Sequence, residues 1–301
     1  RKHGKKFRVA FSISGVALEQ FEAYAPAVLD SFRELAATGQ VEFLAETYYH
    51  SLSALKSDTE FREQVEMHVR RIEQLFGQKP VVFRNTELIY SNDIGDKVAA
   101  MGYKAMITEG AKHILGWKSP NMLYCSASSP KLKLLLKNFQ LSDDIAFRFA
   151  EKRWNEWPLT AEKFTRWISE LNPRDELVNL FMDYETFGEH QWAETGIFEF
   201  LKAFPDYAIE KAGMRFFTPS QMAEKLQPVA PLHIPYPISW ADEERDLTAW
   251  LGNEMQDEAF DKLYRLEGML REINDEKLLR DWRLLQTSDH FYYICTKWFS
   301  D

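Results

Sequence analysis

The sequence has little of what marks disulfide-rich, membrane-spanning or nucleic-acid-binding proteins. Its 301 residues contain only two cysteines, Cys125 and Cys295, which lie far apart, so neither a disulfide framework nor a zinc site is predicted. No apolar run approaches the ~18 residues of a membrane span. Lys and Arg form no extended run and the formal net charge is -9, which argues against a polyanionic partner. We expect a cytoplasmic protein with no cofactor, no metal, no nucleic-acid partner and no membrane partner.

Short β-type runs alternate with helical patterns along most of the chain. Strands are predicted at 7–14, 41–47, 81–85, 104–108, 122–126, 145–149, 177–183 and 214–218, and helices at 18–37, 53–76, 94–101, 130–141, 161–171 and 194–203. This alternation favours parallel strands. Because no GxGxxG follows any of the strands, we expect a closed α/β barrel rather than an open dinucleotide-binding sheet.

The pattern changes near Ser239. Three helices are predicted at 242–255, 257–273 and 276–286, with no strand between them. A proline-rich connector precedes them, and proline suits extended crossings better than helix interiors. The sequence therefore predicts a barrel domain over 1–230 and a C-terminal helical region over 231–301 that closes the active site.

Carboxylates gather where the predicted strands end, which is where parallel barrels place their catalytic groups. They are Glu42, Glu46, Glu87, Glu109, Asp183 and Glu185. Asp and Glu beside aromatic residues suit glycosidic cleavage, which needs one carboxylic acid to protonate the leaving oxygen and one carboxylate to attack or activate water. Taken singly, Glu87 fits a solvated loop carboxylate equally well, and Asp183 an ion pair with Arg84. For His50 and His190 a structural role is favoured over catalysis.

Four separated stretches carry a resemblance to glycoside hydrolase family 57, the α-amylase and glucanotransferase family. Gly39-Gln40-Val41-Glu42 resembles its second motif and Arg84-Asn85-Thr86-Glu87 its third. Asp183-Tyr184-Glu185 resembles the fourth motif and Thr287-Ser288-Asp289-His290 the fifth. The resemblance implies an incomplete (β/α)7-type parallel barrel with a C-terminal helical region.

The resemblance also assigns roles to residues. Glu87 would be the nucleophile and Asp183 the acid/base of a retaining double displacement, with their carboxyls about 5 to 5.5 Å apart. Glu42, Glu185 and Asp289 would bind sugar hydroxyls or tune pKa values, with His290 and Trp240 as further candidates for the substrate groove. The family's first motif, His-Gln-Pro on the opening strand, has no counterpart, because the chain starts at what should be the next strand.

The expected function is α-amylase-like cleavage of α-1,4-glucans such as starch, glycogen or maltooligosaccharides. A 4-α-glucanotransferase or a branching enzyme would use the same intermediate. A metal-dependent polysaccharide deacetylase is a further alternative, although the HxxxH pair expected of that family is absent. A non-catalytic α-glucan-binding protein is the non-enzymatic alternative, suggested by the missing first motif. The sequence predicts no oligomeric state.

Overall fold

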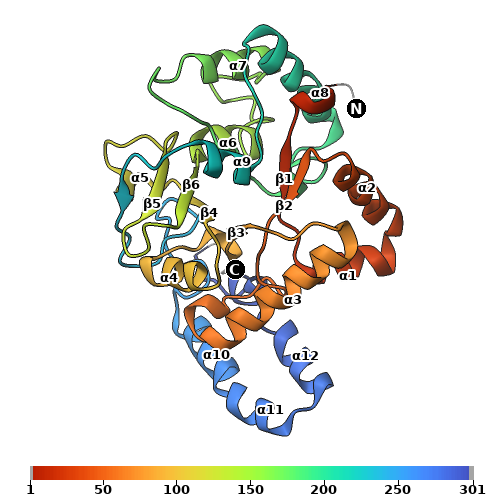
Figure 1. The fold of residues 1–301 in the computed structure, drawn as a ribbon, viewed down its shortest axis with the longest axis vertical. Helices are drawn as coiled ribbons and strands as arrows, with labels where there is room; N and C mark the ends of the chain where they lie inside the picture. Colours follow the sequence, from red (N-terminus) through yellow and green to blue (C-terminus); the bar gives the residue numbers. More distant parts are fainter. Residues whose placement is uncertain (1–2, 298–301) are drawn as a thin grey trace.

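The computed structural model describes residues 3–297, and a wall of parallel strands lies at its centre (Figure 1). In spatial order the parallel strands are β1 (Val9–Phe11), β2 (Val41–Phe43), β3 (Val82–Arg84), β4 (Ala105–Glu109) and β6 (Lys133–Lys137). A parallel bridge between Ala45 and Phe83 joins the pair β1 and β2 to the other strands. A parallel bridge between Lys137 and Asn179 adds one more segment beyond β6. The carboxyl ends of six parallel segments that are adjacent in space therefore meet at one edge.

Helices lie around this wall. They are α1 (Gly15–Tyr24), α2 (Pro26–Ala37), α3 (Asp58–Phe76), α4 (Asn92–Ala100), α5 (Lys112–Leu115), α6 (Phe139–Ala146), α7 (Ala161–Ser169), α8 (Ile197–Asp206) and α9 (Pro219–Lys225). Of these, α7 and α8 pack with α6 in a hydrophobic cluster of their own. The longest, α3, begins where the Ser57 side chain accepts a hydrogen bond from the Glu60 amide. It ends at Gly77, whose φ of 66° suits a residue without a side chain. Local signals thus set both ends of α3.

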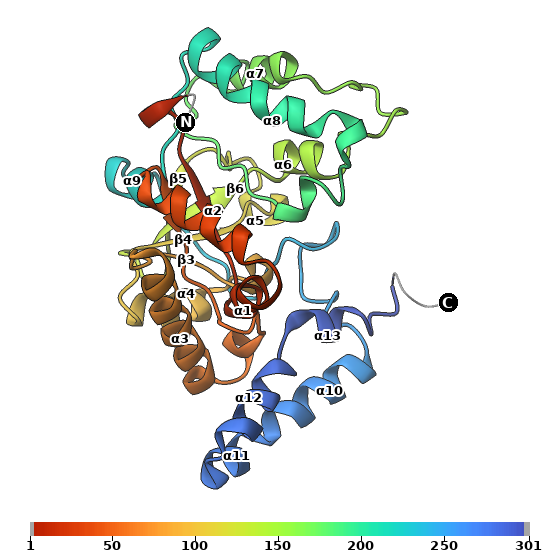
Figure 2. The ribbon, with the colours of Figure 1, turned by 90° about the vertical axis from the view of Figure 1, so that its right-hand side faces the viewer.

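The C-terminal helices form a lobe beside α3, coloured blue in Figures 1 and 2. They are α10 (Glu254–Arg265), α11 (Glu267–Ile273), α12 (Glu276–Leu284) and α13 (Ser288–Tyr292). Phe260, Trp282 and Phe291 from this lobe are buried in the same hydrophobic cluster as Phe83 and Leu134 from the strands. The lobe therefore packs against the barrel through a continuous apolar core.

The architecture confirms the predicted incomplete (β/α)7-type parallel barrel with a C-terminal helical region. The boundary at residue 230 stays a prediction. At that point β7 (Pro231–Leu232) pairs in parallel with β5 (Leu123–Ser126). The last four residues of the predicted helical region lie outside the described part of the chain.

Several predicted elements are wrong. The helix at 130–141 is instead β6 followed by the start of α6, because a strand buried on both faces has a continuous apolar run that resembles a helix. The strand at 145–149 is the end of α6 and the turn after it, and 214–218 forms no strand. Also, β5 runs antiparallel to β6, which the alternating pattern did not predict.

Two predicted elements close to the candidate site residues are also wrong. The strand at 177–183 is reduced to the single bridge at Asn179, and Tyr184–Thr186 form a 3-10 turn. Asp183 and Glu185 are therefore not on one face of an extended strand. The helix predicted at 242–255 is mostly turns and bends, in which Asp242 and Arg245 have positive φ, and α10 starts only at Glu254. Every helix within residues 3–297 is too short or too polar to cross a bilayer.

Candidate active site

Charged side chains line the edge where the parallel segments end. From β2 onward they are Glu46, Arg84, Glu87, Glu109, Lys137 and Asp183. Four of them, Glu46, Arg84, Glu109 and Lys137, are at most 5% exposed. Buried charges are costly unless they are paired, so their contacts indicate what this edge is built to hold.

Glu87 lies at the centre of this group, on the short turn Thr86–Leu88 that follows β3. Its side chain is 12% exposed. Trp240 Nε1 donates to Oε2 at 2.7 Å, and Ser288 Oγ donates to Oε1 at 2.7 Å. His50 Nε2 lies 3.3 Å from the same Oε1. Three segments distant in sequence therefore hold one carboxylate.

These contacts keep Glu87 ionised. Burial alone would raise its pKa, because removing water disfavours the charged form. The hydrogen bond and charge of His50, the charge of Arg84 and the Ser288 hydroxyl outweigh burial and lower the pKa to about 2. The backbone at Glu87 has φ 57°, an uncommon value for a residue with a side chain. Ionised and oriented, Glu87 is suited to act as a nucleophile.

The pKa of Asp183 is shifted in the opposite direction to that of Glu87. Burial raises its pKa, the charges of Glu87 and Glu185 raise it further, and Arg84 and His190 oppose them. The charges of Glu87 and Asp183 therefore act on each other, and Arg84 acts on both. Two carboxylates with pKa values shifted apart are the usual arrangement of a base or nucleophile and an acid.

Two cations lie close to the ring of Trp240. The Arg84 guanidinium is 5.4 Å from its ring and the Lys137 ammonium 5.1 Å. Lys137 also pairs with Glu109 at 3.6 Å and with Asp143 at 3.3 Å. The structure thus brings Trp240, predicted for the groove, into direct contact with Glu87.

Three other predicted site residues lie around this centre. Crowding by protein atoms raises the pKa of Asp289, with Glu87 and Glu185 adding to the effect and His50 and His290 opposing it. Asp289, Glu185 and His290 therefore share the electrostatic field of Glu87 and Asp183. The structure brings them together although they come from segments about a hundred residues apart in the sequence.

Glu42 lies elsewhere. It is on β2, and its Oε2 accepts a hydrogen bond of 3.0 Å from the Ser220 amide at the start of α9. Burial raises its pKa, opposed by hydrogen bonds from Ser220 and Thr218. The contacts of Glu42 are thus with α9 rather than with the group around Glu87.

The structure adds groups that the sequence reasoning did not assign. Ser288 lay within the fifth motif, yet only the fold shows its hydroxyl on Glu87. Lys137 directly follows the apolar run Leu134–Leu136. A lysine at the end of such a run was the sequence signal that could have identified it as a site residue. His50 was expected to be structural, and it lies between Glu46 and Glu87, 3.2 Å and 3.3 Å away.

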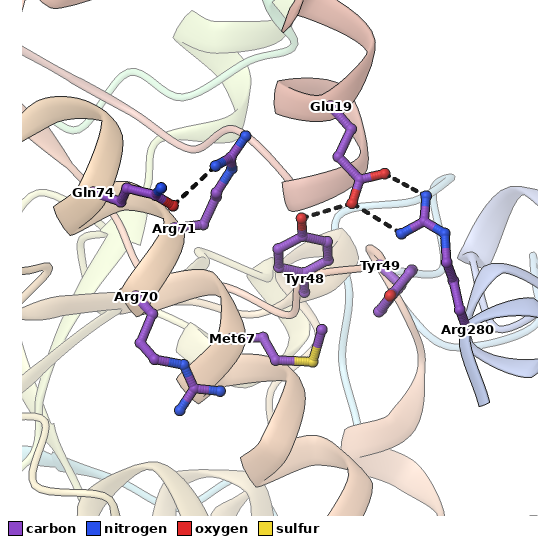
Figure 3. Close-up of a pocket in the computed structure, with 8 residues that line it drawn as sticks. All are labelled: Glu19, Tyr48, Tyr49, Met67, Arg70, Arg71, Gln74 and Arg280. Carbon is purple, nitrogen blue, oxygen red and sulfur yellow. Dashed lines mark hydrogen bonds and ion pairs between the residues drawn. The ribbon is translucent and has the colours of Figure 1, made fainter. Parts of the chain in front are cut away.

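The part of the chain between residues 3 and 297 holds no group of three or more His, Cys, Asp and Glu side chains arranged to bind a metal ion. A hollow of about 350 Å³ lies between α1, α3 and α12 (Figure 3). Tyr48 and Tyr49, which directly precede His50, form part of its lining, and Tyr48 Oη donates to Glu19, which also pairs with Arg280. These contacts connect the loop that carries His50 to α1 and α12.

Comparisons with known proteins agree with this arrangement. The sequence profile described as "Glycosyl hydrolase family 57" matches residues 1–235. A Methanocaldococcus jannaschii protein named "Putative alpha-amylase" is 44% identical over 306 residues, covering 98% of this chain and 65% of that protein. The chain thus spans less than two thirds of the curated relative's length.

Solved structures show the same fold at low sequence identity. The GH57-type branching enzyme from Pyrococcus horikoshii superimposes with a TM-score of 0.74 at 16% identity, over 94% of this chain and 65% of that one. The 4-alpha-glucanotransferase from Thermococcus litoralis superimposes with a TM-score of 0.67 at 20% identity, over 90% of this chain and 42% of that one.

Proposed function

The chain belongs to glycosyl hydrolase family 57, and on this premise we propose that it cleaves α-1,4-glucans by a retaining double displacement. Glu87 is the nucleophile and Asp183 the general acid/base. The observation that carries the proposal is the opposite shift of the two carboxyls: the pKa of Glu87 is lowered to about 2, whereas that of Asp183 is raised. Two such carboxyl groups are the minimum that retaining glycoside cleavage requires.

In the first step a Glu87 oxygen attacks the anomeric carbon while Asp183 protonates the departing glycosidic oxygen. The C–O bond to the leaving sugar breaks and a glycosyl ester of Glu87 forms. In the second step Asp183, now ionised, takes a proton from water, which attacks the anomeric carbon and releases Glu87. Two inversions at the same carbon retain its configuration.

Trp240 and Ser288 support this chemistry by directing the carboxylate. Each donates a hydrogen bond of 2.7 Å to a different oxygen of Glu87, which fixes the plane of the carboxylate. Arg84 lies close enough to lower the pKa of both Glu87 and Asp183, so it limits the repulsion between them when both are ionised. Glu185, Asp289 and His290 surround the two carboxyls and are proposed to bind sugar hydroxyls.

The acceptor in the second step decides between hydrolysis and transfer. Water gives an amylase, whereas the hydroxyl of another glucan gives a 4-α-glucanotransferase or a branching enzyme. The similarity to the amylase-named relative, which is 44% identical, favours hydrolysis as the first proposal. The transferase and branching alternatives rest on solved structures that are similar in fold.

The test is incubation of the protein with maltoheptaose, followed by separation of shorter, longer and branched products. Glu87→Gln and Asp183→Asn should each reduce turnover by about 10³-fold or more, since each removes one chemical role. Proton NMR of the first products should show the α-anomer. Glu66→Gln and Asp30→Asn are matched controls, because both carboxylates are exposed and pair with arginines of their own helices, Arg70 and Arg33.

Three results would contradict the proposal. If Glu87→Gln or Asp183→Asn retained full activity, the catalytic role proposed for that residue would be wrong. Activity that disappears with a chelator and returns with a metal ion would favour the deacetylase class. Binding of maltoheptaose without any turnover by the wild-type protein would favour the non-catalytic glucan-binding alternative.

A further inference from the structure

We propose that His50 is a positioning residue that remains an imidazolium and connects Glu46 to Glu87, holding Glu87 ionised and correctly oriented for attack. The proposal rests on the function proposed above and adds to it a three-residue array, Glu46–His50–Glu87. Neither Glu46 nor His50 needs to touch the substrate. They act through Glu87.

The geometry of the ring carries the proposal. His50 Nδ1 lies 3.2 Å from Glu46 Oε2, and Nε2 lies 3.3 Å from Glu87 Oε1. A neutral imidazole has one N–H and one lone pair, so one of its nitrogens would present a lone pair to a carboxylate. Only the imidazolium donates from both nitrogens. The position of the ring between two carboxylates therefore favours the charged form over the neutral tautomer, whose Nδ1 lone pair would accept from Arg84 Nη1 3.4 Å away.

The backbone around His50 is arranged to hold this position. His50 has φ 50° and Glu87 has φ 57°, both in the left-handed region that side chains disfavour. The Ser288 amide donates to the His50 carbonyl at 2.9 Å, while the Ser288 hydroxyl donates to Glu87. Unfavourable backbone conformations persist where the surrounding contacts enforce them, and they are common at functional sites.

Every element packed around the ring contributes to its charge state. Glu46 follows β2 and is 1% exposed, Glu87 follows β3, and Asp289 from α13 is close enough for the charge of His50 to oppose the rise in its pKa. The cation that opposes them is Arg84, whose Nη1 lies 3.4 Å from Nδ1. Burial lowers the pKa of His50, but the hydrogen bonds with both glutamates outweigh it and raise the pKa to about 9.

The consequence for Glu87 is a fixed positive charge beside one of its two oxygens. That charge is one of the main causes that lower the pKa of Glu87. Glu46 supports the other side of the ring, since it accepts hydrogen bonds from Ser12 Oγ at 2.6 Å and from His50. Burial opposes the ionisation of Glu46, yet the His50 hydrogen bond and the charge of Arg84 lower its pKa to about 2. Ionised Glu46 thus keeps His50 charged, and charged His50 keeps Glu87 ionised.

The first test measures protonation directly and does not depend on activity. The protein is labelled with ¹⁵N-histidine, and His50 is assigned by comparison with His50→Gln. Both ring nitrogens should stay protonated from pH 6 up to about 9, where the proton is lost. Glu46→Gln and Glu87→Gln should each lower that midpoint by about one to three pH units, and the exposed control Glu258→Gln should not move it. A wild-type midpoint near 6.5 would overturn the inference.

The second test uses kinetics. In His50→Gln, kcat should fall about 10- to 100-fold, the effect expected from loss of a charge-assisted hydrogen bond, while KM changes little. The acid limb of the kcat/KM profile should move up by about one to three pH units, because Glu87 loses its cation. An unchanged acid limb would overturn the inference. If Glu87→Gln retains turnover while the titration gives a midpoint near 9, the proposed function fails and the charged array stands.

Discussion

The indole Nε1 of Trp240 donates a 2.7 Å hydrogen bond to Glu87 Oε2 across 153 residues of sequence. The Trp240 amide also donates to the Glu87 carbonyl at 3.2 Å. Trp240 therefore hydrogen-bonds both the side chain and the backbone of Glu87. A tryptophan near a sugar site is usually considered as a stacking surface for the substrate. Here its polar edge holds the carboxylate proposed as the nucleophile.

Trp240→Phe should therefore lower kcat about tenfold, because an aromatic ring stays near Arg84 and Lys137 while one hydrogen bond to a charged group is lost. Steady-state kinetics with maltoheptaose measures this. Trp117→Phe is the matched control, since Trp117 is 93% exposed. A raised KM with unchanged kcat would mean that Trp240 acts as a substrate platform instead.

Substitution of the two proposed catalytic carboxylates should change stability in opposite directions at pH 7. The pKa of Glu87 is lowered from 4.5 to about 2, so its ionisation contributes stability above its unfolded pKa, which is lost as pH falls from about 4.5 toward 2. Glu87→Gln should cost about 3 kcal/mol at pH 7. The pKa of Asp183 is raised, so its charge is unfavourable in the folded protein at pH 7. Asp183→Asn should therefore raise the free energy of unfolding at pH 7.

Thermal unfolding at pH 7 measures both effects, and a rise in Tm is expected for Asp183→Asn. Repetition near pH 3 should shrink the deficit of Glu87→Gln, since the wild-type carboxylate then begins to lose its advantage. If both substitutions changed the free energy of unfolding in the same direction at pH 7, the prediction that Glu87 is stabilised and Asp183 destabilised by its charge would be wrong.

The attachment of the C-terminal lobe depends on Glu60 of α3, which is 0% exposed. Arg271 and Arg283 both donate to it, at distances from 2.8 to 3.1 Å. Glu60→Gln should destabilise the protein by about 2 to 3 kcal/mol, less than a fully buried pair because both arginines are partly exposed. Chemical denaturation measures this. Glu258→Gln, which breaks an exposed pair with Lys262, should change nothing measurable.

Two glycines should respond oppositely to alanine. A Cβ at Gly110 would collide with the backbone carbonyl of Lys137, so Gly110→Ala should destabilise by about 1 to 3 kcal/mol and displace Lys137 from Trp240. A Cβ at Gly268 in α11 meets nothing within 4 Å, so Gly268→Ala should stabilise by up to about 1 kcal/mol. Denaturant titrations of both variants test this, and a loss of stability in Gly268→Ala would contradict it.

The alternation of strands and helices and the edge that holds the carboxylates could be predicted, because apolar runs ending in Glu or Asp mark the carboxyl ends of strands. What could not be predicted was contact across the sequence. His50 resembled a turn residue, and only the fold places it between Glu46 and Glu87. Glu42 and Glu46 looked equivalent on the same strand, but Glu42 contacts the start of α9 whereas Glu46 contacts His50.

The helix predicted at 130–141 failed for a different reason. Periodicity describes one buried face, and β6 is buried on both, so its sequence contains no alternation to read. The strand predicted at 177–183 failed because its residues are only partly buried and form one bridge, at Asn179. Asp183 still reaches the carboxyl edge, since that bridge is parallel.

The three partners of Glu87 do not become available together during synthesis on the ribosome. His50 precedes Glu87 and is present when the β3 strand forms, whereas Trp240 and Ser288 emerge about 150 and 200 residues later. Of these three partners a growing chain therefore has only His50 until residues 240 and 288 have been added, and the two neutral donors reach Glu87 only when the segments that carry them fold. Competence of this site requires the chain up to Ser288.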